Sequence, residues 1–474
     1  MRKKFLDDVS ASSLQVIFNQ GLGLLIFLLT SRFLSKPVYG EFNWSLAVMA
    51  FVTAVLSLRL EQIVVRKVAA GDDPSKMLSL FLWHSIFGGV FFYAALLIAH
   101  IIFPAFFQQH NLLLLLAISQ LTSFFTSPFK QLANGQEFFR PLAIMSSVAN
   151  VIRAVWLLII VLFNSIDIQQ VIIIYIVSAL AELLVCFYIV QFRLKVAVKT
   201  SWSSKDYFLL LQESLPQIGV VFLNALIARF DWILLGIWCS SVVTAEYSFA
   251  YKVFELCPLP MLILGPILLS RFSRYFSNHT ETSLTEKKRE LGFFIRYAMI
   301  AATLLPLMLN VIWGPVADVL TGYKYGAVNK ITFLLLSLCI PFQYMINLLW
   351  TIQFAQNHLK RILKITVITG IVIVAGDLLM IPLLNAKGAA TVYLVATTIE
   401  YLVYLRSSIL IKIKESWLSV AVCLGIALAS GFAVEYLHIP LVMKLLAAVA
   451  LYLLLLVVTR QVKKNDWKLV REWV

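Results

Sequence analysis

Long apolar stretches recur along the whole chain and are separated by short polar or basic segments. A helix of about 18 residues or more is long enough to cross the ~30 Å hydrocarbon core of a bilayer. The pattern predicts fourteen such helices, near residues 12–34, 39–58, 77–103, 111–129, 141–163, 168–192, 214–238, 242–270, 291–312, 328–354, 363–383, 388–409, 417–434 and 440–459. No polar block between them is long enough to form a soluble domain. The predicted fold class is therefore an all-α integral membrane protein.

Composition supports this interpretation. Hydrophobic residues make up 61% of the chain and charged residues 13%, whereas soluble domains have roughly 45–50% and about 25%. The net charge of +15 is typical of nucleic-acid-binding proteins, but the position of the basic residues argues against such a partner. With the N-terminus inside, most of them, Lys130 included, fall on cytoplasmic segments, as the positive-inside rule requires. Both termini are therefore expected in the cytoplasm.

Residue types used in metal or nucleotide chemistry form no motif. The five cysteines are scattered through apolar segments, the six histidines show no H-E-x-x-H spacing, and no phosphate-binding G-x-x-x-x-G-K-[ST] loop occurs. We therefore expect no metal, no cofactor and no catalytic residues.

The two halves of the chain resemble each other. Residues 40–45 (GEFNWS) match residues 245–250 (AEYSFA), and Glu182 matches Glu400 within the similar segments 181–185 and 399–403. Because six predicted spans separate the copies, the repeat is parallel, as in transporters that work by alternating access. The predicted domains are two six-helix lobes, 1–205 and 206–412, followed by two extra helices and a basic tail, 413–474.

Charged side chains inside predicted spans are the first candidates for function, because burying a charge in the bilayer costs roughly 2.5–3.5 kcal/mol on insertion scales. Arg229 and Arg153 lie near the middle of their spans. The fixed fork of guanidinium donors suits phosphate oxygens, so both are candidates for binding a pyrophosphate; interhelical ion pairs are the structural alternative. Arg296 lies closer to the inner face and is expected to snorkel to water.

Acidic residues in the spans are candidates for binding a coupling proton or ion. These residues are Asp231, Glu182, Glu400, Asp377 and Glu255. Asp231 is only two residues from Arg229, so the two cannot pair along one helix face. The alternative for each is a buried carboxyl that binds a neighbouring helix.

Lys252 and Glu255 are three residues apart, which predicts an intrahelical ion pair. Competition of a substrate phosphate for Lys252 would turn this pair into a switch. Uncharged polar side chains are also present in the spans: Gln15, Asn19 and Asn224 could bind sugar hydroxyls or join helices.

The segment 229–252 contains Arg229-Phe-Asp231, Leu235-Gly236, Glu246-Tyr247-Ser248 and Ala250-Tyr251-Lys252. These residues, together with NAKGAA at 385–390, resemble the polysaccharide (O-antigen type) flippases of the multidrug/oligosaccharidyl-lipid/polysaccharide exporter superfamily. The resemblance implies two lobes around a central cavity in a bacterial inner membrane. It also implies transport of an anionic polyprenyl-diphosphate-linked oligosaccharide to the outer leaflet, for surface polysaccharide biosynthesis, with polysaccharide polymerases as possible partners besides membrane lipids.

Two other function classes, a cation antiporter and a membrane glycosyltransferase or polymerase, fit the sequence less well. A multidrug antiporter for organic cations would favour carboxylates in the first span, and residues 12–34 contain neither Asp nor Glu. A membrane glycosyltransferase or polymerase needs catalytic groups on a long outer loop, whereas the loop expected at 313–327 offers only Asp318 and Lys324. Two driving forces for transport are compatible with the sequence. One is the membrane potential, worth roughly 2.3 kcal/mol per charge per 100 mV, and the other is counter-transport of a proton or sodium ion.

Overall fold

A computed structural model of the protein describes residues 2–163, 166–198, 202–258, 260–261, 284–356 and 358–462. Within these ranges all regular structure is helical, and thirteen helices are long and apolar enough to cross a membrane. The all-helical fold is confirmed. Of the fourteen predicted spans, the one at 242–270 begins as a helix that ends at Phe254, and most of its remainder lies outside the described residues.

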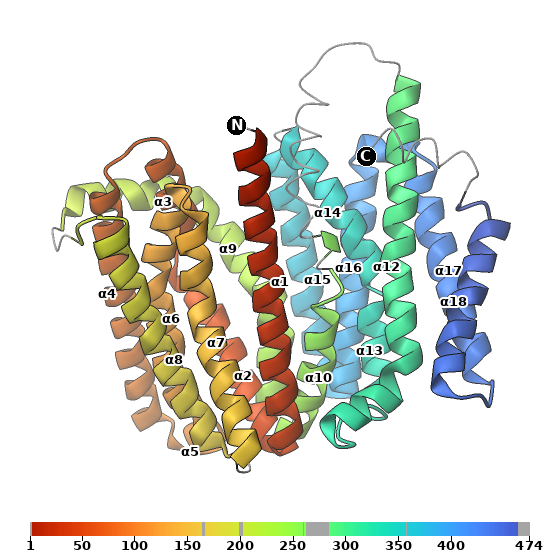
Figure 1. The fold of residues 1–474 in the computed structure, drawn as a ribbon, viewed down its shortest axis with the longest axis horizontal. Helices are drawn as coiled ribbons and strands as arrows, with labels where there is room; N and C mark the ends of the chain where they lie inside the picture. Colours follow the sequence, from red (N-terminus) through yellow and green to blue (C-terminus); the bar gives the residue numbers. More distant parts are fainter. Residues whose placement is uncertain are drawn as a thin grey trace. The chain divides into compact units, whose positions relative to one another are not determined.

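The chain divides into two compact units, residues 1–245 and 246–474. The first unit contains α1 (Arg2–Phe33), α2 (Lys36–Leu56), α3 (Leu60–Ala69), α4 (Pro74–Ile102), α5 (Pro104–Gln109), α6 (Leu112–Gly135), α7 (Phe139–Phe163), α8 (Ile168–Tyr188), a π-helical turn (Ile189–Arg193) and α9 (Ser204–Trp238). Helix α6 packs against α2, α3, α4 and α8, whereas α1 packs on α7 and α9 packs on α2 (Figure 1). More of α6 is buried than of any other candidate span in this unit, which makes it the central helix.

Several helix ends in the first unit are fixed by local chemistry. Asp73 caps α4, where its Oδ1 accepts a hydrogen bond from the Ser75 backbone N–H at 3.0 Å ahead of Pro74 at the first helical position. Asp167 and Gln170 form a capping box at the start of α8. Arg59 has a φ of +63°, and this left-handed residue separates α2 from α3.

The first turns of α9 lie before its membrane-spanning part and are held by ion pairs. Glu213 contacts Arg66 Nη2 at 2.6 Å and Lys67 Nζ at 2.8 Å. Asp206 contacts Lys76 Nζ at 2.8 Å. These pairs tie the beginning of α9 to α3 and to the beginning of α4.

The second unit contains most of α10 (Ser241–Phe254), which crosses the division, then α12 (Leu284–Thr321), α13 (Lys330–Ser337), α14 (Ile340–Ala355), α15 (Leu359–Leu384), α16 (Ala386–Arg406), a 3-10 turn (Ile409–Lys412), α17 (Glu415–Glu435) and α18 (Leu441–Val458). Helices α15 and α16 form one close pair, and α17 packs on both α12 and α18 (Figure 1). Gly388 belongs to the first pair, because a β-carbon there would lie 2.3 Å from the Met380 carbonyl oxygen.

Two predicted elements differ from the structure. The span predicted at 328–354 is broken into α13 and α14, because Pro341 has no N–H for the bond that a continuous helix would need. The outer loop predicted at 313–327 is shorter, because α12 continues through Pro315 to Thr321. The predicted domain boundaries after residues 205 and 412 stay predictions; α9, which follows the first of them, packs on α2 and α3 of the first unit.

Candidate functional site

Arg229 and Asp231 lie on α9. The Arg229 guanidinium carbon is 5.3 Å from the centre of the Trp232 ring, and Trp232 itself is buried. An aromatic face stabilises a cation within about 6 Å, so this ring helps to hold the Arg229 charge. Asp231 is 3% exposed, and its Oδ1 accepts a hydrogen bond from the Trp232 backbone N–H at 2.7 Å.

The packing of α2 on α9 and on the first residue of α10 depends on Trp44 and two glycines. Trp44 Nε1 donates a hydrogen bond to the Ile233 carbonyl oxygen at 3.1 Å. A β-carbon on Gly236 would lie 1.8 Å from Trp44 Cδ1, and one on Gly40 would lie 1.8 Å from the Ser241 carbonyl oxygen. Only glycine permits such close approach of helices. The indole therefore anchors the helix that carries Arg229.

Arg153 is attached to the neighbouring helix α8. Its Nε donates a hydrogen bond to Ser178 Oγ at 2.8 Å, and its guanidinium carbon lies 4.2 Å from the centre of the Tyr175 ring. Both contacts join α7 to α8, and among the described residues the half-buried Arg153 side chain has no ion pair. The hydrogen bond to Ser178 uses one of the five guanidinium donors.

Glu182 of α8 forms an ion pair with a lysine of the neighbouring helix α6. The carboxylate is 4% exposed and forms an ion pair with Lys130 Nζ. Lys130 was expected on a cytoplasmic segment after the span at 111–129, whereas α6 continues past it to Gly135. The cytoplasmic placement of Lys130 stays a prediction; only the helix end differs, because α6 continues through Pro128.

The uncharged polar candidates lie on α1 and α9. Asn19 Oδ1 accepts a hydrogen bond from Asn150 Nδ2 of α7 at 3.4 Å, so it contributes to the α1–α7 contact. Gln15 is half-buried on α1, and Asn224 is exposed on α9. All three belong to the first unit.

The predicted pair of Lys252 and Glu255 is confirmed, with Lys252 Nζ 2.8 Å from Glu255 Oε2. Both side chains are about one-third exposed. The pair lies at the end of α10 and in the turn that follows. An ion pair that is one-third exposed remains accessible to a competing anion.

The remaining charged candidates lie in the second unit. Asp377 is 1% exposed on α15, and Glu400 is half-buried on α16. Arg296 was expected to snorkel, but it is 5% exposed and its Nη1 donates a hydrogen bond to the Gln461 carbonyl oxygen at 3.1 Å. The snorkelling prediction was wrong because the segment after α18 covers this side chain.

Sequence reasoning missed a buried pair in the first unit. Glu41 Oε2 lies 3.0 Å from His110 Nδ1, with the two side chains 10% and 3% exposed. The His110 ring stacks on Trp44 with centroids 3.9 Å apart and an interplanar angle of 25°. Glu41 and Trp44 both belong to the repeated segment 40–45, which served only to detect the repeat; nothing in the local sequence brings His110 to them.

The second copy of the repeat forms a related cluster without histidine. Phe249, which matches Trp44, stacks on Tyr325 with centroids 4.6 Å apart. Glu246, which matches Glu41, accepts a hydrogen bond on its carbonyl oxygen from Asn329 Nδ2 at 2.9 Å. Burial raises the pKa of the Tyr325 hydroxyl, and the charge of Glu246 adds to this shift.

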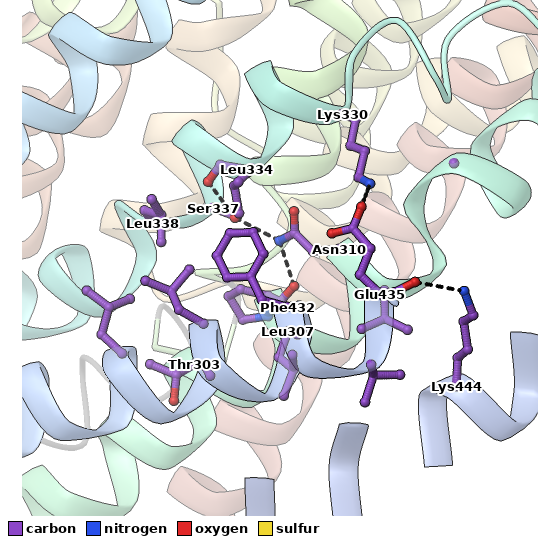
Figure 2. Close-up of a pocket in the computed structure, with 18 of the residues that line it drawn as sticks. Thr303, Leu307, Asn310, Lys330, Leu334, Ser337, Leu338, Phe432, Glu435 and Lys444 are labelled. Carbon is purple, nitrogen blue, oxygen red and sulfur yellow. Dashed lines mark hydrogen bonds and ion pairs between the residues drawn. The ribbon is translucent and has the colours of Figure 1, made fainter. Parts of the chain in front are cut away.

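A cavity of about 390 Å³ lies within the second unit, between α12, α13, α17 and α18. Figure 2 shows Leu307, Leu334 and Phe432 among its apolar lining and charged groups on one side. There Lys330 pairs with Glu435, and Lys444 Nζ donates a hydrogen bond to the Glu435 carbonyl oxygen at 3.3 Å. The cavity can admit an apolar chain with a polar end. Across the described ranges, no three His, Cys, Asp or Glu side chains gather closely enough to hold a metal ion.

Comparison with known families gives one match. The model of a family described as "Polysaccharide biosynthesis protein" matches residues 5–268, which is more than half of the chain and includes Arg229, Arg153 and Lys252. No individually curated protein matches this sequence.

Solved structures show the same fold. The structure of the lipid II flippase MurJ in an inward closed conformation has 15% identity and a TM-score of 0.74, covering 95% of this chain and 98% of that one. An inward-facing multidrug resistance MATE family transporter of the MOP superfamily has 13% identity and a TM-score of 0.67, covering 82% and 93%. A MOP superfamily transporter from Pyrococcus furiosus has 11% identity and a TM-score of 0.59, covering 89% and 96%. The predicted superfamily fold is thereby confirmed.

Proposed function

The chain belongs to the polysaccharide biosynthesis protein family, and from this premise we propose that it is a flippase. It moves an anionic polyprenyl-diphosphate-linked oligosaccharide from the inner to the outer leaflet by alternating access, for surface polysaccharide biosynthesis. The observation that carries the proposal is the family match over residues 5–268. The MurJ-like fold across 95% of the chain agrees with it.

The charge of the substrate is inferred from the basic residues inside the spans. Arg229 is only half-buried, and Trp232 supports its charge on one side. We assign Arg229 to the diphosphate, with Arg153 and Lys252 as further cationic contacts and Gln15, Asn19 and Asn224 as contacts for sugar hydroxyls. The apolar cavity of the second unit supports a lipid-linked substrate, because its walls suit a hydrocarbon chain.

The coupling candidates are assigned by their surroundings. Because Glu182 already pairs with Lys130, its proposed role is structural. Asp231, Asp377, Glu400 and Glu255 stay candidates for a proton or sodium ion. The protein is proposed to lie in a bacterial inner membrane with both termini in the cytoplasm, where polysaccharide polymerases would be its partners.

The alternative function of a cation antiporter is disfavoured by the first span. Residues 15–33, the membrane-spanning part of α1, contain no carboxylate, so a cationic substrate would find no counter-charge there. The glycosyltransferase alternative is disfavoured by Asp318, the one acidic residue of the predicted outer loop. Its Oδ1 accepts a hydrogen bond from the Gly326 backbone N–H at 2.7 Å, so it closes the turn after α12.

The experiment compares Arg229→Ala and Arg229→Lys with the unchanged protein in cells that lack their own copy. Surface polysaccharide is measured together with the amount of protein in the membrane. We expect alanine to lower the polysaccharide about tenfold or more, which corresponds to ~1.4 kcal/mol, and lysine to keep part of it because the positive charge remains.

A matched control is Arg406→Ala, because Arg406 is exposed in the last turn of α16 and has no proposed substrate contact. It should leave polysaccharide unchanged. Full activity of Arg229→Ala at normal protein level would contradict the proposal and favour the antiporter alternative.

A further inference from the structure

The pair of Glu41 and His110 joins two helical segments of the first unit. Glu41 lies in the first turns of α2, and His110 lies between α5 and α6. Their Oε2–Nδ1 distance of 3.0 Å is within hydrogen-bonding range, and water has little access to either side chain. Histidine is the side chain that changes charge in the physiological pH range when unperturbed, and a nearby carboxylate favours its charged form.

Aromatic rings and one hydroxyl surround the pair of Glu41 and His110. Among the described residues, the Glu41 carboxylate has one hydrogen bond besides that to His110, from the Ser45 hydroxyl of α2 at 3.4 Å. The other faces of the His110 ring are covered by Trp44 of α2 and Phe106 of α5. No other charged side chain in the described part of the protein pairs with either residue.

The charge balance of the pair depends on one proton. With that proton bound, an imidazolium faces a carboxylate and the net charge is zero. When the proton leaves, a neutral imidazole faces a carboxylate and one negative charge remains buried, which is costly in a medium of low dielectric constant. We propose that Glu41 and His110 form a binding site for a single proton, whose occupancy controls the contact between α2 and α9.

The link to α9 runs through Trp44. One face of its indole stacks on the His110 ring, and its N–H donates to the Ile233 carbonyl oxygen. Ile233 is one turn beyond Arg229 on the same helix. A change in charge or position of the imidazole therefore acts on the side chain that anchors α9.

This inference deepens the proposed function, and its role in transport rests on that function: the proton bound here would be the coupling ion. As a site for a coupling proton, this pair differs from the carboxylates named above, since it combines a carboxylate with a histidine, whose unperturbed pKa lies in the physiological range. Binding of the proton itself can be measured without any substrate.

The experiment follows the imidazole nitrogens of the full-length protein, labelled with 15N-histidine and reconstituted in lipid nanodiscs, from about pH 5 to about pH 8. The chain has six histidines, and the resonance that His110→Gln removes is assigned to His110. We expect this resonance to titrate as a single proton. In Glu41→Gln, its midpoint should move to lower pH by about tenfold or more in proton concentration, because the imidazolium loses its counter-charge.

The matched control is His100→Gln, since His100 lies on α4, is exposed and, among the described residues, has a ring contact with Phe107 and no hydrogen bond or ion pair. It should leave the titration of His110 unchanged. An invariant His110 resonance over the whole range, or the same midpoint with and without the Glu41 carboxylate, would overturn the proposal. If a substitution at 110 or 41 prevents folding, Ser45→Ala tests the site more gently. The His110 midpoint should shift to higher pH, because the carboxylate loses the Ser45 hydroxyl as a donor; a shift to lower pH would contradict the proposal.

A second measurement tests whether the proton on the Glu41–His110 pair controls the contact between α2 and α9 through Trp44. Trp44→Phe keeps an aromatic ring on His110 but removes the donor to Ile233, so the His110 titration should persist. The dependence of surface polysaccharide on external pH should then be lost; if it persists unchanged, control through Trp44 is wrong. If the unchanged protein supports no polysaccharide at all, the proposed function fails, whereas the histidine titration still decides the proton site.

Discussion

The two copies of the repeated segment form clusters that share packing but differ in chemistry. In the first unit, Trp44 stacks on His110, which contacts the buried Glu41 carboxylate. In the second unit, Phe249 stacks on Tyr325. Because burial, with a further contribution from Glu246, raises the pKa of Tyr325, that hydroxyl stays protonated at neutral pH. The repeat therefore keeps the aromatic stack in both halves, with a histidine ring on Trp44 in the first half and a tyrosine ring on Phe249 in the second.

The largest expected effect concerns the first position of the repeat, where Gly40 matches Ala245. A β-carbon on Gly40 would overlap the Ser241 carbonyl oxygen, and the backbone there cannot move without separating α2 from α10. We expect Gly40→Val to destabilise the protein by more than about 4 kcal/mol, seen as loss of folded protein in the membrane. The control Ala245→Gly should cost only about 1 kcal/mol; similar losses from both would show that the close approach is not specific to Gly40.

A second comparison concerns Glu182 and Glu400, which match between the halves. Glu182 pairs with Lys130, whereas Glu400 has no ion pair in the described part of the chain. Glu182→Gln leaves the Lys130 charge largely buried, so we expect a loss of about 3 kcal/mol, measured as a lower melting temperature in detergent. Glu400→Gln should change stability by less than about 1 kcal/mol. Equal effects would contradict the assignment of Glu182 to a structural role.

Exchanging the two aromatic partners tests the difference between the clusters directly. His110→Tyr should keep the stack on Trp44 and abolish the pH dependence of transport, because a tyrosine hydroxyl does not titrate near neutral pH. Tyr325→His should introduce a second titrating imidazole. Both are measured as surface polysaccharide against external pH, with protein level as control; a pH dependence retained in His110→Tyr would place the titrating group elsewhere.

The smallest effect concerns the ion pairs at the beginning of α9. Hydrogen bonds from Lys67 and Lys76 lower the pKa values of Glu213 and Asp206. Since both pKa values are lower in the folded protein, the pairs stabilise it at neutral pH, and this contribution is lost as the pH falls below about 4. We expect Glu213→Gln to lower stability by less than about 1 kcal/mol at pH 7 and by less still at acidic pH. The melting temperature at the two pH values measures this, and an equal loss at both would contradict it.

The helices were predictable because each span must bury its own backbone in lipid, and about 20 apolar residues in a row suffice to show this. The ion pair of Lys252 and Glu255 was predictable for a similar reason, since a spacing of three residues brings two side chains together on one helix. Interruptions of the helices were harder to predict, because Pro341 divides its span whereas Pro128 and Pro315 lie inside continuous helices. Neighbouring helices decide these cases, and a single sequence does not contain them.

The sequence by itself determined the membrane-spanning class, the repeat, and which side chains carry charge into the bilayer. Only the tertiary structure decided which of those charges have partners: Glu182 meets Lys130 from 52 residues earlier, and Glu41 meets His110 from 69 residues later. Hydrophobicity is a property of each side chain by itself, so membrane-spanning segments can be recognised along the sequence. An ion pair or a ring stack between helices depends on how those helices pack, which no local pattern records.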